Sequence, residues 1–599
     1  RDVLGSRGLG DVYKRQVTKK AAFTGSAQTV DNKDLMKKTD ANFMKSLEGS
    51  VAGLQVNSLT GQPGAYASTT IRGVGSMNSG TEPLYVIDGI AIYTDKMGAY
   101  NKAGTGDMAA SPMANINPND IESITVLKDA TATAIYGARA ANGVIVVTTK
   151  KGSLGKARFN VNAKVGTSFV GKIDHNYRTT NLDKYKEIWT EGLTNAGYDG
   201  EDGMTSAEWL NAYVMDWYNV DLTQNIKSVD WLKEILQNGF SQEYDISAQG
   251  GNENLRYYIS GGYFQNTGIV IGTGMKRYSG RISLDGKSGR IGYGLSVNGA
   301  LSDINNTMTE SQYTNPIVAV YDIRPFEQVR NEDGTYNYTV NSIGDATNHT
   351  LDSFFGTDGD RRFYIQGYFN YDRAFGDHHV GGMLLYNQDE YNSNVNSSLL
   401  NSLPKRRMGI AVRAAYDYAN RYLFEFNAGY NGSENFAKGH RFGFFPSVSV
   451  GWNISQEKFW EPIRNIVSNF KIRGSYGLVG NDQVPYTRFL YMGITTLNDS
   501  PSYQTGYGSH KESHNGPTFS RFENEDMTWE VGHKLNVGAD IQLFNSLNLT
   551  VDAFREIRSN ILTTKGSIPN YLGAAKTVIY GNFAKVKNWG VDLAVDYGK

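Results

Sequence analysis

Two short motifs carry side chains of the kind that bind metal ions. His510 and His514, in HKESH, have the i, i+4 spacing at which two histidines on one helix can share a metal. They lie in a glycine-rich stretch without a third ligand nearby, so we expect a solvated loop. Asp199, Glu201 and Asp202, in YDGEDG, offer oxygen ligands of the calcium type but lack the spacing of a complete calcium loop. We therefore expect no metal site and no cofactor, with calcium at these carboxylates as the alternative.

Charged residues in the first quarter of the chain could form a polar cluster. They are Arg72, Asp88, Lys128, Asp129 and Arg139. Carboxylates paired for acid–base catalysis would be one interpretation. Salt bridges between two parts of the fold are favoured, because ion pairs are often structural. The sequence has no nucleophile elbow, phosphate-binding loop or zinc-protease helix, and it has no cysteine to act as a nucleophile. We therefore expect a protein that is not an enzyme.

These charged residues fall in a segment, residues 17–152, that mixes short strands with helical turns. A helix capped by Asp40 is expected early in it, and a helix over 130–136, capped by Asp129, is expected near its end. The alanines of KDATATAIYGARAANGVIVVTT (128–149) permit close backbone approach. Strands are expected at 54–56, 69–73, 83–89, 123–127 and 144–149. The segment is therefore predicted to be a compact α/β domain.

From residue 153 onward the sequence pattern has a period of two. Runs such as FNVNAKVGTS (159–168) and WGVDLAVDY (589–597) alternate apolar with polar or charged residues, which gives each strand one apolar and one wet face. About fifteen strands are expected, near 157–169, 241–250, 254–266, 276–286, 290–302, 361–373, 378–390, 408–418, 421–431, 443–454, 469–479, 534–543, 547–557, 579–587 and 589–598. An all-β transmembrane antiparallel β-barrel is therefore predicted over residues 153–599.

Short and long connections alternate between these strands. Brief turns such as GNEN (251–254) and FGDHH (375–379) separate longer segments. The long segments are 170–240, 303–360, 391–407, 480–533 and 558–578. One connection, 455–468, breaks the alternation. An outer-membrane barrel has short periplasmic turns and long external loops, so we expect the long segments to lie on the outer side of the membrane.

Charge and hydropathy exclude other classes of protein. The net charge is −1, with 59 basic and 60 acidic residues spread along the chain. The sequence therefore shows no basic region of the kind that binds nucleic acid. No run of about 18 apolar residues occurs, so helical membrane spans are excluded. Many of the 38 Tyr, 26 Phe and 8 Trp stand at strand ends, where they suit a membrane interface. Residues 1–16 match nothing downstream and are expected to be a cloning or assembly scar, or else a disordered arm.

Several stretches of the sequence resemble the SusC/RagA family. In the first domain they are SLEGSVAGLQV (46–56), GQPGAYASTTIRGVGS (61–76), PLYVIDGI (83–90) and NPNDIESITVLKDATATAIYGARAANGVIVVTTKKG (117–152). Later ones are VDWLKEILQNGFSQEYDISAQGGNENLRYYISGGYFQNTGIV (229–270), FGFFPSVSVGWNISQEKFW (442–460) and FKIRGSYGLVGN (470–481). The resemblance implies that residues 17–152 are a TonB-dependent receptor plug domain, held in the lumen of the barrel.

The same resemblance implies a function. SusC/RagA proteins are TonB-dependent transporters in the outer membrane of Bacteroidetes-type bacteria. The implied activity is active import of a nutrient, either a glycan or a peptide, across the cell outer membrane. The implied partners are the TonB–ExbB–ExbD energy-coupling complex, a SusD-like surface lipoprotein and outer-membrane lipid. The alternatives are a siderophore or vitamin receptor of the same fold and a β-rich adhesin that does not transport.

Large aromatic side chains in the long loops are the candidates for contact with substrate or with the lipoprotein. Such side chains offer a large contact area with a polar tip at a low cost in conformational entropy. Packing within the loops is the competing interpretation. The candidates are Trp189, Trp209, Trp217, Tyr218, Tyr313, Tyr321, Tyr486, Tyr491 and Tyr503.

The sequence departs from the family pattern at both ends. No TonB-binding segment is recognisable before Val17, so we expect that the chain as written cannot perform energised uptake. The resemblance implies about twenty-two strands, a number seen in plugged outer-membrane transporters. The chain stops at VDYGK, inside an alternating run. We therefore expect a partial barrel that does not close.

Overall fold

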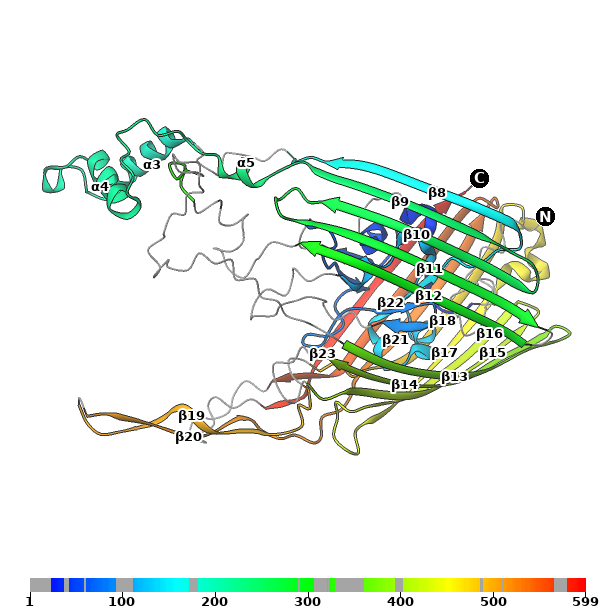
Figure 1. Cartoon of the computed structure of the whole chain (residues 1–599). Coiled ribbons are helices and arrows are strands. Elements are labelled where there is room, and N and C mark those ends of the chain that lie inside the picture. Colours follow the sequence, from blue (N-terminus) through cyan, green and yellow to red (C-terminus); the bar gives the residue numbers. More distant parts are fainter. Residues whose placement is uncertain are drawn as a thin grey trace.

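Two curved antiparallel sheets form a wall around a small α/β unit in the computed structural model (Figure 1). The structure describes residues 23–36, 42–58, 61–92, 111–171, 181–288, 291–305, 320, 323–328, 360–393, 402–484, 488–508, 510–564 and 579–598. The wall comprises a five-stranded sheet and a nine-stranded sheet. We call the α/β unit, which comprises the described residues before residue 153, the plug.

Every strand of the five-stranded sheet pairs with its neighbour in the sequence. These strands are β8 (Gly155–Ser168), β9 (Gly239–Gly251), β10 (Leu255–Thr267), β11 (Gly274–Ser288) and β12 (Ile291–Asn305). The nine-stranded sheet continues in the same manner, except that β18 pairs with β21. Its strands are β13 (Asp360–Phe375), β14 (His378–Ser393), β15 (Lys405–Tyr418), β16 (Tyr422–Ser433), β17 (Phe442–Asn453), β18 (Val467–Asn481), β21 (Glu530–Leu543), β22 (Leu547–Thr564) and β23 (Tyr580–Tyr597).

The alternation of apolar and polar residues determines which face of each strand meets the plug. Trp589 of β23 is 75% exposed, whereas Asp592, on the opposite face, is 7% exposed and contacts the plug. Phe159 and Val161 of β8 are exposed in the same way. The apolar face therefore points outward and the polar face points inward, which confirms the period-two prediction. Within the described part of the chain, β12 does not pair with β13 and β8 does not pair with β23, so the wall is not closed.

Two details of the strand prediction for residues 153–599 are wrong. Residues 579–587 and 589–598 were expected to be two strands, but residues 580–597 form the single strand β23, which pairs along its length with β22. The alternation runs through Asn588 without a turn, so nothing separates the two halves. The second error lies within 480–533, where β19 (Ile494–Thr505) and β20 (Glu512–Arg521) form a hairpin rather than a loop. The described wall strands therefore number fourteen.

The plug is built on a mixed five-stranded sheet with the order β1-β6-β7-β4-β5. Its strands are β1 (Ala27–Asp31), β4 (Leu84–Ile87), β5 (Ile90–Ile92), β6 (Ile121–Leu127) and β7 (Val144–Thr149), and β2 (Leu54–Asn57) pairs separately with β3 (Ser68–Ile71). The central strand β7 is buried throughout, as its continuous β-branched sequence requires. Short helices complete the unit: α1 (Asn32–Leu35), η2 (Phe43–Leu47), η3 (Pro112–Asn115), η4 (Pro118–Asp120), α2 (Ala130–Thr133), η5 (Ala134–Tyr136) and η6 (Ala138–Asn142).

The helix expected to be capped by Asp40 differs in the structure. A short 3₁₀ helix, η2, begins after Asn42, whose side chain accepts a hydrogen bond from the Met44 amide at 3.1 Å. Asp40 itself lies outside the described residues. The apolar residues Phe43, Met44 and Leu47 are buried as expected, because they pack against the plug sheet.

Further helices lie in the connections between wall strands. They are α3 (Leu182–Asn195), η8 (Glu201–Gly203), α4 (Ser206–Tyr218), α5 (Trp231–Ile235), η9 (Ile454–Gln456) and η10 (Lys458–Ile463). Helices α3 and α4 and the β19–β20 hairpin project from the same end of the wall, opposite the short turns (Figure 1). Among the helices that the structure describes, none is long and apolar enough to cross a membrane.

Candidate functional site: the plug interface and the outer loops

One carboxylate of the wall contacts two cations of the plug. Arg72 follows β3, and its guanidinium donates from Nε to Asp592 Oδ2 of β23 at 3.0 Å. The Lys128 ammonium lies 3.6 Å from the same oxygen and also donates to the Ala52 carbonyl at 2.6 Å. Burial lowers the pKa of Lys128, because the plug and the wall exclude water from its charge. Asp592 therefore ties β23 to two separate segments of the plug.

The carboxylate of Asp88 links the plug to the other sheet of the wall. It accepts hydrogen bonds from the Thr149 amide at 3.0 Å and from Arg281 Nη2 of β11 at 2.9 Å. Asp88 and Arg72 both have left-handed backbone conformations, with φ values of 52° and 58°. Such a conformation costs about 1 kcal/mol for a residue with a Cβ. Each is therefore held in an unfavourable backbone geometry that aims its side chain at the wall.

Asp129 has two roles at the start of the alanine-rich helix. Its Oδ1 accepts from the Ala132 amide at 2.9 Å, which caps α2 as predicted. Its Oδ2 accepts from the Ser475 hydroxyl of β18 at 2.7 Å. Burial raises the pKa of Asp129, and these hydrogen bonds oppose that rise. The side chain of Arg139 lies outside the described residues.

Other wall residues also bind this region of the plug, although the sequence analysis did not include them in the polar cluster. Lys534 of β21 donates to the Ala141 carbonyl at 2.7 Å, and Arg558 of β22 donates to Asn142 Oδ1 at 2.7 Å. Both cations also pair with Glu556, at 3.7 Å and 2.8 Å. Strand parity predicts that these side chains face the lumen. Their partners lie about four hundred positions away in sequence, and no local pattern identifies them.

The five-stranded sheet binds the plug through a second polar group. Asp120 of η4 accepts from the Tyr258 hydroxyl at 2.8 Å and from the Ser260 hydroxyl at 2.5 Å. Asn117 donates to Asp245 Oδ1 at 2.6 Å. The plug is therefore fastened to both sheets by hydrogen bonds and ion pairs. Apolar contact with the wall also occurs, at Met383, Leu385 and Ala411 among other side chains.

A plug loop reaches the end of the wall from which α3, α4 and the β19–β20 hairpin project. Ser76 and Ser79 donate to Glu530 Oε1, at 3.1 Å and 2.5 Å, where β21 begins after the outer connection. Asn78 donates to the Leu562 carbonyl near the end of β22 at 3.0 Å. Between these anchors Met77 is 69% exposed. This plug loop, which the sequence analysis did not identify, therefore lies at that end of the wall with Met77 exposed.

The aromatic candidates in the outer loops divide into three groups. Trp189 of α3 and Trp217 of α4 are 47% and 52% exposed. Trp209, Tyr218 and Tyr491 are partly buried by neighbouring rings, as when Tyr218 packs edge-on against Phe326 at 5.5 Å. The remaining candidates, Tyr313, Tyr321, Tyr486 and the side chain of Tyr503, lie outside the described residues. Among the candidates that the structure describes, Trp189 and Trp217 therefore expose the largest share of their side chains.

The two metal-like motifs have other structural roles. His514 lies in β20 rather than in the expected loop, and its Nε2 is 2.6 Å from the Thr505 hydroxyl across the hairpin. Because a strand does not bring i and i+4 side chains to one point as a helix does, His510 and His514 do not form a helical ligand pair. Asp199 Oδ1 accepts from the Ser206 amide at 3.1 Å, which anchors the start of α4. Within the described ranges no group of three His, Cys, Asp or Glu side chains could hold a metal.

Comparison with known sequences identifies both parts of this arrangement. The TonB-dependent receptor plug domain matches residues 19–144, and the TonB dependent receptor-like β-barrel matches residues 216–598. The chain is 27% identical over 675 residues to TonB-dependent receptor P3 of Formosa agariphila and 27% identical over 677 residues to TonB-dependent receptor SusC of Bacteroides thetaiotaomicron. These alignments cover 96% of this chain but only 60% and 63% of the two relatives. The chain thus spans about three fifths of their length.

Solved structures show the same fold. The RagAB peptide importer in its open-open state superposes with a TM-score of 0.75 at 23% identity, covering 97% of this chain and 72% of that one. The siderophore receptor PirA from Acinetobacter baumannii superposes with a TM-score of 0.58 at 12% identity, covering 96% of this chain and 78% of that one. The barrel match extends over more than half of the chain, and the plug match covers the unit inside it. The chain belongs to the TonB-dependent receptor family.

Proposed function

We propose that the protein carrying this chain imports a nutrient, an oligosaccharide or a peptide, across the bacterial outer membrane by TonB-dependent transport. The supporting observation is the polar plug–wall interface. Ion pairs and hydrogen bonds such as Arg72–Asp592 and Asp88–Arg281 can be exchanged for water when the plug moves. An extensive apolar interface would favour permanent docking instead. A plug held in this way can block the pore at rest and can be displaced when TonB applies a force to it.

The outer end of the molecule supplies the surface for substrate and partner. Helices α3 and α4, which carry the exposed Trp189 and Trp217, project beyond the wall (Figure 1). Met77 is exposed at the same end of the wall, in the plug loop that Ser76 anchors to Glu530. Aromatic faces stack on sugar rings and also pack against peptide side chains, so either substrate class fits this surface. A SusD-like lipoprotein is proposed to bind at the same end, and the TonB–ExbB–ExbD complex is proposed to act from the other.

Uptake by whole cells tests this proposal. Cells that produce the protein together with its SusD-like lipoprotein should accumulate a labelled oligosaccharide or a labelled peptide. Deletion of TonB should abolish the accumulation. Accumulation of a ferric siderophore instead would identify the receptor alternative. Binding of either nutrient at the cell surface, with no TonB-dependent entry, would overturn the transport proposal in favour of an adhesin.

A further inference from the structure

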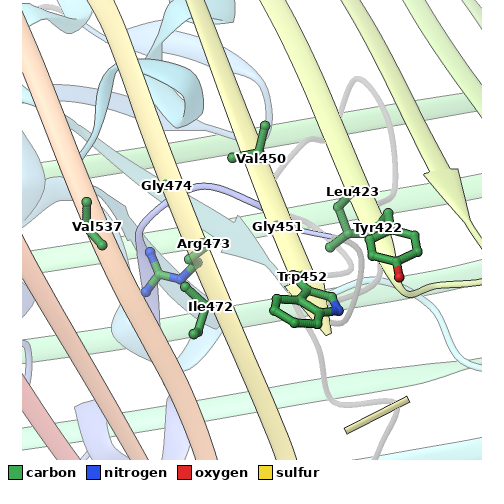
Figure 2. A pocket seen from close by; sticks show the side chains of 9 residues that line it. All are labelled: Tyr422, Leu423, Val450, Gly451, Trp452, Ile472, Arg473, Gly474 and Val537. Carbon is green, nitrogen blue, oxygen red and sulfur yellow. The ribbon is translucent and has the colours of Figure 1, made fainter. Parts of the chain in front are cut away.

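An apolar hollow interrupts the outward face of the nine-stranded sheet (Figure 2). It has a volume of about 610 Å³ and lies over Gly474 of β18, which pairs with Val450 of β17 and Val537 of β21. Gly474 faces outward, because Arg473 and Ser475 on either side of it are buried against the plug side. A Cβ atom at Gly474 would meet nothing closer than a backbone oxygen at 4.0 Å. The missing side chain therefore creates the hollow between two valines.

One end of the hollow is lined by aromatic side chains with fixed polar tips. Figure 2 shows Tyr422, Trp452 and Ile472 at this end. The Tyr422 hydroxyl donates to Glu457 Oε1 at 2.8 Å, and Trp452 Nε1 donates to the same oxygen at 3.1 Å. Arg421 pairs with the other oxygen of Glu457 at 3.5 Å. Rings that are apolar on one side and hydrogen-bonded at the tip are typical of the membrane–water interface.

Glu457 belongs to the connection between β17 and β18, the one that breaks the alternation of short and long connections. This connection, residues 454–466, is here called the foot. Phe459 of the foot is 64% exposed and Ile466 is 55% exposed. Phe544, on the adjacent turn, is 63% exposed, and its amide donates to the Ile466 carbonyl at 2.9 Å. Large apolar side chains gathered at the edge of an apolar wall face are stabilised by contact with lipid.

The foot and its neighbour Arg421 carry charges of both signs. The cations are Arg421, Lys458 and Arg464, and the anions are Glu457 and Glu461. Lys458, Glu461 and Arg464 are exposed. An anionic headgroup would leave the exposed Glu461 facing like charge. A headgroup with both a phosphate and an ammonium satisfies both signs.

We propose that the hollow and the foot together bind one zwitterionic phospholipid of the periplasmic leaflet. An acyl chain occupies the hollow over Gly474. The headgroup phosphate meets Lys458 and Arg464, and its ammonium meets Glu461. The two parts are continuous, because Tyr422 and Trp452 line the hollow and also hydrogen-bond the foot. The inference rests on the outer-membrane location within the proposed function, but not on transport.

Native mass spectrometry of the protein released from nanodiscs tests the site. The nanodiscs contain equal amounts of phosphatidylethanolamine and phosphatidylglycerol. Gly474→Leu fills the hollow and should reduce retained phosphatidylethanolamine about tenfold. A tenfold loss corresponds to roughly two acyl-chain methylene groups that are no longer buried in the hollow. Gly367→Leu is the matched control, since Gly367 of β13 has no atom within 4 Å of the added Cβ. Retention should be unchanged in this control. Lys458→Glu combined with Arg464→Glu should remove the preference for phosphatidylethanolamine while Gly474 is intact.

Three other outcomes contradict the proposal. Equal retention by Gly474→Leu and Gly367→Leu would show that the hollow holds no acyl chain. Retention of phosphatidylglycerol at the level of phosphatidylethanolamine would contradict the headgroup assignment. A dimer mass that Gly474→Leu abolishes would replace the lipid with a second copy of the chain. Uptake serves as the separate readout for the proposed function, and both leucine variants should retain it. Lipid retention without TonB-dependent uptake would remove the transport proposal alone.

Discussion

Asp592 is a wall residue that contacts two separate segments of the plug. Its carboxylate pairs with Arg72 and Lys128, and these three side chains are almost fully buried. Removing one partner from a buried ion pair typically costs 3–5 kcal/mol, because the remaining charge loses both its partner and its water. We expect Asp592→Asn to destabilise the docked plug by about 3 kcal/mol. Asp596→Asn, an exposed position on the same strand, should have no measurable effect.

The absence of cysteine allows a direct measurement of this effect. A single cysteine in place of Ala132, which is fully buried in the plug, should react with maleimide only after the plug has unfolded. The urea concentration that gives half-maximal labelling then reports plug stability. An Asp592→Asn midpoint equal to that of Asp596→Asn would show that this ion-pair cluster does not hold the plug.

The burial of Lys128 predicts that plug stability depends on pH. Burial lowers its pKa below the 10.5 usual for lysine, so the unfolded plug binds this proton at pH values where the docked plug releases it. More protons are then bound in the unfolded state, and stability should rise with pH in the window just below 10.5. Lys128→Met should abolish this rise, and Lys151→Met, at an exposed plug position, should preserve it. Urea midpoints measured between pH 8 and the upper pH limit of barrel stability give the dependence of plug stability on pH. A rise in stability in both variants would show that a group other than Lys128 causes it.

At the scale of elements, the alanine-rich helix explains a glycine of the wall. Gly477 of β18 faces the plug, and a Cβ at this position would lie 2.8 Å from the Ala130 Cβ of α2 and 2.3 Å from the Ser447 Cβ of β17. Gly477→Ala should therefore push α2 away from the wall and cost about 1–3 kcal/mol of plug stability. Gly474→Ala is a control on the same strand with an outward-facing Cβ. Equal urea midpoints for the two variants would show that α2 does not depend on this close approach.

The β19–β20 hairpin is one of the elements that the sequence analysis did not predict, and the reason is local. Pro501 and Pro517 interrupt its two strands, and the pairing register shifts between Thr496 and Asp499. Proline lacks the amide that a strand ladder needs, so the sequence favoured a loop.

The wall strands were predictable because each repeats an apolar–polar alternation that any short window contains. Contacts such as Asp592 with Arg72 were not, because they join positions 520 residues apart.

The same hairpin provides a test of the outer surface. Its ends are adjacent, since Ile494 pairs with Arg521. Replacing residues 494–521 by a short glycine linker should leave the plug anchors at Glu530 intact. We expect normal insertion into the outer membrane and weaker binding of substrate or lipoprotein, measured by pull-down from solubilised membranes. Unchanged binding of both ligands would place their contacts elsewhere, on α3 and α4 or on the plug loop.

At the scale of the whole molecule, the placement of the two ends relative to the membrane is testable. Helices α3 and α4 and the β19–β20 hairpin share one end of the wall, and the short turns share the other (Figure 1). A cysteine in place of Tyr507, a 93% exposed residue at the hairpin tip, should react with an impermeant maleimide on intact cells. A cysteine in place of Asn252, in the short turn after β9, should react only after the outer membrane is permeabilised. The opposite result would invert the topology.

The connectivity of the wall has a consequence for the order of assembly. Almost every wall strand pairs with its neighbour in the sequence, so the wall can grow hairpin by hairpin with small loop-closure costs. Plug contacts are different in kind: the Lys471 ammonium donates to the Phe23 carbonyl across 448 positions, and Thr24 meets Ser449 across 425. Contacts of such high sequence separation form late. We therefore expect the nascent protein to pass through a stage with a formed wall and an undocked N-terminal unit, and quality control in the periplasm would meet an unobstructed channel during that interval.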